Sequence, residues 1–219
     1  MKTMTLLLIK PELLEKGSAF EFSDQIINSL RKEDELFVVG IGSAVSLACM
    51  AVQRSTSLAR ASVDELSLSY IGSPMLGLGG VFFVIGKEPK RDWEKERKDL
   101  EKGMNLSFDR NGQLVVISRK LLPEKTIPLC LSKLLEADSL KISATANSIN
   151  RAVSIALELT EGTIAPYELC IPLVSLSTVK FVGEENTVLE TAMDIFLKKG
   201  KKAPRSKKHE QMLKELQNR

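Results

Sequence analysis

Two kinds of hydrophobic pattern run along the first half of the chain in a fixed order. Apolar runs or strict alternation predict strands, and apolar residues three or four positions apart predict helices. The strands are expected at 4–9, 35–40, 65–71 and 80–86. Helices are expected over 22–32 and from the turn at 42 to about Thr56. The predicted order is therefore β-α-β-α-β-β.

The same order returns 104 positions later. Strands are expected at 113–118, 139–143, 167–181 and 187–198, and helices at 128–137 and up to Thr160. The residues that align at this offset are similar in type: Asp34 with Asp138, Leu36 with Leu140, Val38 with Ile142, Gly42 with Ala146, Val45 with Ile149, and Ala48 with Ala152. Such self-similarity indicates a tandem repeat of one structural unit. Pro172 predicts that the strand around it is interrupted or lies at a sheet edge.

The repeat divides the chain into four parts. Residues 1–86 form the first domain and 104–200 the second. Between them, 87–103 read as a charged helical connector, and a hairpin turning at Asn111-Gly112 leads into the second copy. Residues 201–219 form a basic tail. The fold class is α+β, with two tandem β-α-β-α-β-β domains, each a mixed sheet with two helices.

Charge is distributed unevenly along the chain. Residues 198–219 hold nine Lys and Arg against two Glu, so this segment carries +7, and the other 197 residues sum to −4 because the total is +3. Attraction to a polyanion must therefore come from the tail or from local patches. The tail itself has three interpretations: a disordered end, a nucleic-acid contact, or a short amphipathic helix through Met212, Leu213 and Leu216.

Little in the sequence suggests chemistry. The three cysteines are scattered among apolar neighbours and predict buried thiols, and the single histidine, His209, stands in the tail, so no metal site or catalytic set can be assembled. No cofactor motif is found. We expect no enzyme, no metal and no cofactor. The apolar run "TLLLI" is too short for a signal peptide or a membrane span, which predicts a cytoplasmic protein without membrane contact.

Small polar residues occupy the junction between strand and helix in both copies. Asn147 and Ser148 are expected to cap the helix that follows, as Ser43 does in the first copy, while Gly42 and Ala146 allow a tight turn. The alternative is an anion site, in which the helix N-terminus binds a phosphate and Arg151, one turn on, reaches it.

These features together resemble the Alba family of small archaeal nucleic-acid-binding proteins. The resemblance rests on the β-α-β-α-β-β order, the strand-end basic pair in "VVISRK", the "ISATANSINRAVSIALEL" turn and helix, and the final hairpin. The same architecture resembles the C-terminal domain of translation initiation factor three. The family's members pair as dimers that bind DNA or RNA backbones. Two copies in one chain would then mimic that dimer, and further oligomerisation stays open.

Carried over by position, the family's basic residues are only partly kept. Arg119 and Lys120 fall on its strand-end lysine pair, Lys10 is the remnant in the first copy, and Arg151 falls on the basic residue of the helix. The family's Arg-Gly-Arg turn corresponds to 145–147 and to 41–43, and neither stretch keeps an arginine.

The resemblance implies a protein that binds the phosphate backbone of DNA or RNA with low sequence specificity, nucleoid-associated if the target is DNA. The residues expected to bind nucleic acid are Lys10, Arg119, Lys120, Asn147, Arg151, Lys180, Lys198, Lys199, Lys201, Lys202, Arg205, Lys207 and Lys208.

The alternative is a degenerate Alba-like scaffold that binds proteins and not nucleic acid. The acidic body and the loss of arginine from both turns favour it. The uncharged Gly72–Gly80 loop would then be the surface for a protein partner.

Overall fold

The computed structural model describes residues 5–13, 17–72, 78–87, 95, 98–99, 113–118, 120–162, 164–182, 187–202 and 204–217. The chain divides into two compact units. The first unit is Met1–Arg91 together with Pro204–Arg219, and the second unit is Asp92–Ala203. The end of the chain thus belongs to the first unit, whereas the sequence predicted a separate tail from residue 201.

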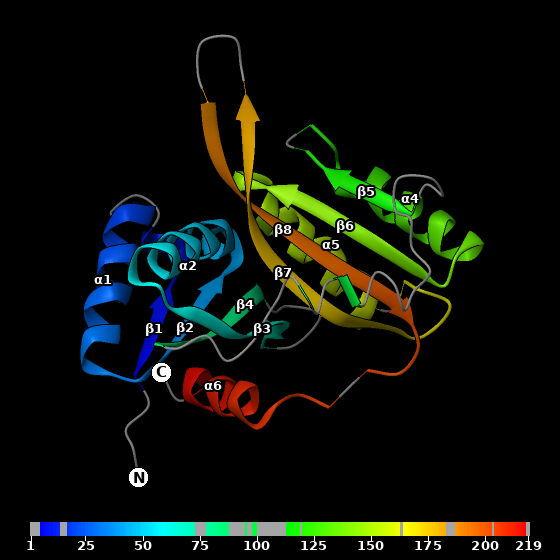
Figure 1. Ribbon diagram of the computed structural model, residues 1–219. Coiled ribbons are helices and arrows are strands. Elements are labelled where there is room, and N and C mark those ends of the chain that lie inside the picture. The colour runs from blue at the N-terminus through cyan, green and yellow to red at the C-terminus, as the bar shows by residue number, and fades with distance from the viewer. Residues whose placement is uncertain are drawn as a thin grey trace. The chain divides into compact units, whose positions relative to one another are not determined.

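The predicted order β-α-β-α-β-β is found in both units (Figure 1). The elements of the first unit are β1 (Leu6–Ile9), η1 (Pro11–Leu13), α1 (Ala19–Lys32), β2 (Glu35–Ile41), η2 (Gly42–Ala44), α2 (Val45–Ala59), β3 (Ser62–Ile71), β4 (Leu78–Gly86) and α6 (Lys207–Gln217). Those of the second unit are β5 (Leu114–Ile117), α4 (Pro123–Glu136), β6 (Ser139–Thr145), η3 (Ala146–Ser148), α5 (Ile149–Glu161), β7 (Leu169–Val182) and β8 (Thr187–Lys199). The expected connector helix at 87–103 and the hairpin at Asn111-Gly112 lie almost entirely outside the described residues.

Within the described residues each unit contains one four-stranded mixed sheet. Sheet A of the first unit has the order β1-β2-β4-β3, and sheet B of the second has the order β5-β6-β8-β7. In each, the first two strands are parallel and the other neighbours antiparallel. The α+β fold class is therefore confirmed. β7 is an edge strand with a register shift between Cys170 and Leu173, as Pro172 predicted.

One face of each sheet is packed against two helices. In β2 this face carries Leu36, Val38 and Gly40. In β6 it carries the equivalent residues Leu140, Ile142 and Ala144. The side chains of these leucine, valine, isoleucine and alanine residues are buried. α1 begins with a capping box, in which the Ser18 hydroxyl accepts from the Glu21 amide and the Glu21 carboxylate accepts from the Ser18 amide. The helix-facing half of the repeat is thus the same in both units.

Gly40 lets α2 approach β2 closely. A Cβ built on Gly40 would lie 2.4 Å from the Ala48 Cβ and 3.2 Å from Val81 Cγ1. We predict that Gly40→Ala lowers the free energy of unfolding by about 1–3 kcal/mol, because helix and strand must move apart. Urea denaturation followed by circular dichroism measures it. The exposed Ser43→Ala should stay within about 0.5 kcal/mol, and an equally small effect of Gly40→Ala would contradict the close approach.

The outer faces of the two sheets differ. Sheet A presents Phe37, Val39 and Ile41 of β2, whereas the repeat equivalents in sheet B are Lys141, Ser143 and Thr145. An apolar outer face has to be covered, because exposed apolar surface is costly in water. A polar outer face has no such requirement.

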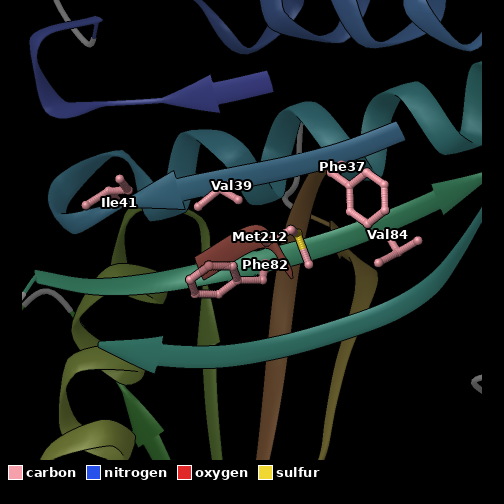
Figure 2. Packing of buried hydrophobic residues seen from close by; sticks show 6 residues of the cluster. All are labelled: Phe37, Val39, Ile41, Phe82, Val84 and Met212. Carbon is pink, nitrogen blue, oxygen red and sulfur yellow. The ribbon is translucent and has the colours of Figure 1, made fainter. Parts of the chain in front are cut away.

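Helix α6 provides the cover in the first unit. The cluster that it completes is Phe37, Val39, Ile41, Phe82, Val84 and Met212, as Figure 2 shows. Leu213 and Leu216 pack against its margin. The interpretation of 209–219 as a short amphipathic helix is thus confirmed as far as Gln217, where α6 ends. Among the described residues, no helix is both long enough and apolar enough to cross a membrane.

Candidate nucleic-acid interface

Three segments of the second unit meet at one edge of sheet B. β5 and β6 are parallel, with Ile117 beside Ala144, so the β5–α4 turn and the η3 turn leave the sheet at the same edge. β8 enters the sheet at this edge, where Thr145 pairs with Ala192. We call this end of the sheet the η3 edge. It brings together segments that are 30 to 60 residues apart in the chain.

The β7–β8 hairpin projects beyond the η3 edge (Figure 1). Its strands stay paired as far as Val182 and Thr187, although β6 ends at Thr145. Lys180, which pairs with Leu189, is exposed three pairs beyond the end of β6. At about 3.4 Å per residue, Lys180 lies about 10 Å beyond the end of β6.

Arg151 has a structural role at this edge that the sequence did not reveal. Its Nη1 donates to the carbonyl of Ser118 at 3.2 Å and to that of Leu121 at 2.7 Å. The guanidinium therefore ties the β5–α4 turn to the first turn of α5. A phosphate bound by Arg151 would have to compete with these two hydrogen bonds or use the other N–H groups of the guanidinium. Lys120 is exposed within the turn that Arg151 holds, and Arg119 lies outside the described residues.

The junction turns have the backbone that was expected but not the expected caps. Gly42 and Ala146 both adopt a positive φ, of 56° and 44°. For an alanine this conformation is unusual and strained. Within the described structure neither η3 nor α5 has a side-chain cap hydrogen bond, so the prediction that Ser148 and Asn147 cap the helix was wrong. Ser148 is buried and Asn147 is exposed, because the one-turn 3-10 helix rotates successive side chains to different sides.

The same edge of the first unit is apolar. A Cβ on Gly42 would lie 3.6 Å from Leu78 Cδ1 and 3.6 Å from Pro11 Cγ, so two apolar side chains border the η2 turn. Lys10 is exposed beside them. The β3–β4 hairpin of the first unit is paired as far as Ile71 with Leu78, two pairs beyond the end of β2. Among the residues that the structure describes there, this edge offers Lys10 as a basic side chain for a phosphate.

The basic residues at the end of β8 and just after it do not join the η3 edge. Lys198 and Lys199 lie at the opposite end of sheet B, where Ser139 pairs with Lys198, about 20 Å away along six residues of β6. Lys199 pairs with Asp138 at 3.5 Å, and Lys202 with Glu161 at 3.3 Å. Lys201 is exposed.

Further along, the predicted tail contacts belong to the first unit. Lys208 forms an ion pair with Glu35, and Arg205 donates to the Ser69 hydroxyl at 2.9 Å. Lys207 is exposed. The described site residues thus fall into four places: the η3 edge with Lys120, Asn147, Arg151 and Lys180, the η2 turn with Lys10, the opposite end of sheet B, and the start of α6.

Among the described residues, one exposed acidic side chain adjoins this edge: Glu124, in the first turn of α4. Glu158 lies near the C-terminal end of α5, where a Cβ built on Gly162 would meet its Oε1 at 2.8 Å, so it is far from the η3 turn. Glu190, beside Val179 in the hairpin, is partly buried. Glu184, the other residue expected to oppose the patch, lies outside the described residues.

Two of the three predicted buried thiols are buried, whereas Cys170 is partly exposed. Cys49 and Cys130 are fully buried. Burial raises the pKa of Cys49, and it raises the pKa of Cys130 to about 12 against a smaller opposing effect of Lys133. Both therefore stay as neutral thiols at neutral pH. No group of three or more His, Cys, Asp or Glu among the described residues is placed to hold a metal ion.

Comparison with solved structures finds similar chains. Alba from Thermoplasma volcanium is similar to 39% of this chain over 99% of its own length, with 20% sequence identity and a TM-score of 0.35. No family model matches the sequence. No curated protein matches it either.

Proposed function

We propose that the protein binds the sugar-phosphate backbone of DNA or RNA through the η3 edge of the second unit. The observation that carries this proposal is the convergence of the β5–α4 turn, the η3 turn and the projecting hairpin, each with an exposed polar or basic side chain. These side chains are Lys120, Asn147 and Lys180. The resemblance noted in the sequence supports the same function. The protein would be a binding protein and not an enzyme.

The contacts available at the η3 edge favour low sequence specificity. Lysine ammonium groups contact phosphates without reading bases. The hydrogen bonds of Arg151 hold the β5–α4 turn in place, so Lys120 would be presented from an ordered turn. Preorganisation of this kind lowers the entropic cost of binding.

The test compares two double variants with the same change in net charge. Lys120→Ala/Lys180→Ala removes the η3-edge lysines, and Lys198→Ala/Lys207→Ala removes two exposed lysines elsewhere. Fluorescent duplex DNA and structured RNA are titrated with the full chain at several salt concentrations. Each lost phosphate contact reduces the slope of log K against log salt by about 0.9, so we expect the edge variant to lose about 1.8.

The control variant should keep most of the slope. An equal loss in both variants would show that overall charge, and not the η3 edge, is responsible. If the wild-type chain binds neither nucleic acid at low salt, the proposed function fails.

One observation favours a protein-binding scaffold as the second candidate. The projecting hairpin carries four large apolar side chains that are about half exposed or more, namely Phe181, Val182, Val188 and Leu189. Apolar side chains in such a position are typical of protein interaction sites. The proposed loop at Gly72–Gly80 lies mostly outside the described residues, and Leu78, at its end, is exposed. If the wild-type chain has no affinity for nucleic acid, protein binding remains as the candidate function.

A further inference from the structure

The single histidine of the chain is buried beneath α6. The side chain of His209 lies in the first turn of that helix and is 2% exposed. Its ring stacks on Phe82, with centroids 4.4 Å apart, and its Nδ1 is 2.7 Å from the Ser67 hydroxyl. Its Nε2 is buried and has no hydrogen-bond partner in the described part of the chain. The ring is therefore placed as a neutral imidazole.

The carboxylates near α6 are engaged by other groups. α6 itself carries Lys207, Lys208, Glu210, Lys214 and Glu215, and Arg205 precedes it. On the strands packed around the helix the charged residues are Asp64 and Glu65 of β3 and Glu35 of β2. β1 and β4 contribute none within their bounds.

Each of the three carboxylates on the strands has a partner other than the histidine. Lys208 pairs with Glu35, and the Ser206 hydroxyl donates to Glu65. The Ser62 hydroxyl donates to Asp64 at 2.6 Å. Among the described residues no carboxylate bonds either ring nitrogen of His209.

We propose that His209 makes α6 a pH-controlled latch on the first unit: the neutral ring permits α6 to cover the outer face of sheet A, and protonation releases the helix and exposes that face. A proton on this ring would create a buried N–H donor and a buried charge without a counter-ion. Moving the ring into water removes that cost, and α6 follows β8 along the chain, beginning at Lys207 after β8 ends at Lys199.

The sign of the pH effect follows from the pKa of His209. Burial, and to a lesser extent the charge of Arg205, lowers this pKa from 6.5 to about 4. The docked state therefore binds protons less readily than the released state. Docking is at full strength above about pH 6.5 and weakens as the pH falls toward 4. At pH 5 the docking constant should be lower by about 30-fold.

The docked helix has few other apolar anchors. Met212 is fully buried, and Leu213 and Leu216 are partly buried. An isolated helix of 11 residues is not stable in water, so α6 should lose its structure once it is released. Release would expose Phe37, Val39 and Phe82 as an apolar surface.

Methionine methyl NMR on the full chain tests the latch. With ¹³C-methyl methionine, the Met212 signal should move from its buried position toward that of free methionine between pH 7 and pH 4.5. Met50 of α2 and Met193 of β8 report on the two units and should stay in place. Met212→Leu assigns the signal.

Two variants isolate the histidine. His209→Gln keeps a polar side chain and His209→Leu keeps apolar contact with Phe82, and both retain Glu35 and Glu65. In either variant the Met212 signal should not change over this pH range. If His209→Gln already prevents the docking of α6 at pH 7, the Met212 signal of His209→Leu provides the test.

Three outcomes would overturn the proposal. They are a wild-type Met212 signal that does not move, a variant that moves over the same pH range as the wild type, and a Met50 signal that moves together with Met212.

Discussion

Met212→Ala is expected to lower the free energy of unfolding of the first unit by about 2–4 kcal/mol. The side chain is fully buried in the cluster between α6 and sheet A, and Figure 2 shows it beside Phe82. Truncation removes its contacts with the aromatic rings and leaves a cavity under the helix. The loss cannot exceed the free energy with which α6 docks, because beyond that point the helix detaches. Urea denaturation at pH 7 measures it.

Gln211→Ala is the matched control for this change. Gln211 is the preceding residue of the same helix and is exposed, so its effect should stay within about 0.5 kcal/mol. If Met212→Ala were equally mild, α6 would not be a stabilising cover of sheet A.

Asp194→Ala is expected to destabilise the second unit by about 3 kcal/mol. Asp194 Oδ2 lies 2.9 Å from Lys141 Nζ, and its Oδ1 accepts from the Ser143 hydroxyl at 2.6 Å. The side chains of Lys141 and Asp194 are only 16% and 10% exposed. Removal of the carboxylate leaves the ammonium group in a poorly solvated place without this counter-ion. Thermal and urea unfolding of the full chain measure the loss.

A double variant tests whether the ion pair itself provides the stability. Replacement of a buried pair by apolar residues is often close to neutral, although breaking it is costly. Lys141→Met/Asp194→Leu should therefore recover most of the loss, to within about 1 kcal/mol of the wild type. A double variant as unstable as the single one would contradict this account.

The fold was largely predictable because it depends on local pattern. Helix-facing positions such as Leu36 and Leu140 repeat at a fixed offset, and both are buried. The edge position of β7 followed from Pro172, which cannot donate to a neighbouring strand. Periodicity and proline chemistry are properties of short segments, so they can be read without long-range contacts.

The position of α6 was not predicted, although one signal was present. β2 is apolar on both faces, with Phe37, Val39 and Ile41 opposite the helix side, whereas β6 has Lys141 and Ser143 at the equivalent places. A strand that is apolar on both faces needs two covers. The amphipathic stretch after the lysines of 198–208 predicts a helix, but the surface that this helix covers lies on distant segments of the chain.

For the candidate site too, some features could be predicted from the sequence and others depended on the fold. The sequence by itself determined which residues are basic, that each strand–helix junction turns through small residues, and that the order of elements repeats. Only the tertiary structure decided that Arg151 holds a turn, that Lys199 and Lys202 pair with carboxylates at the far end of sheet B, and that Lys208 pairs with Glu35. The physical reason is that a side chain's charge is a property of its residue type, whereas its partner depends on which distant segment the fold brings within reach.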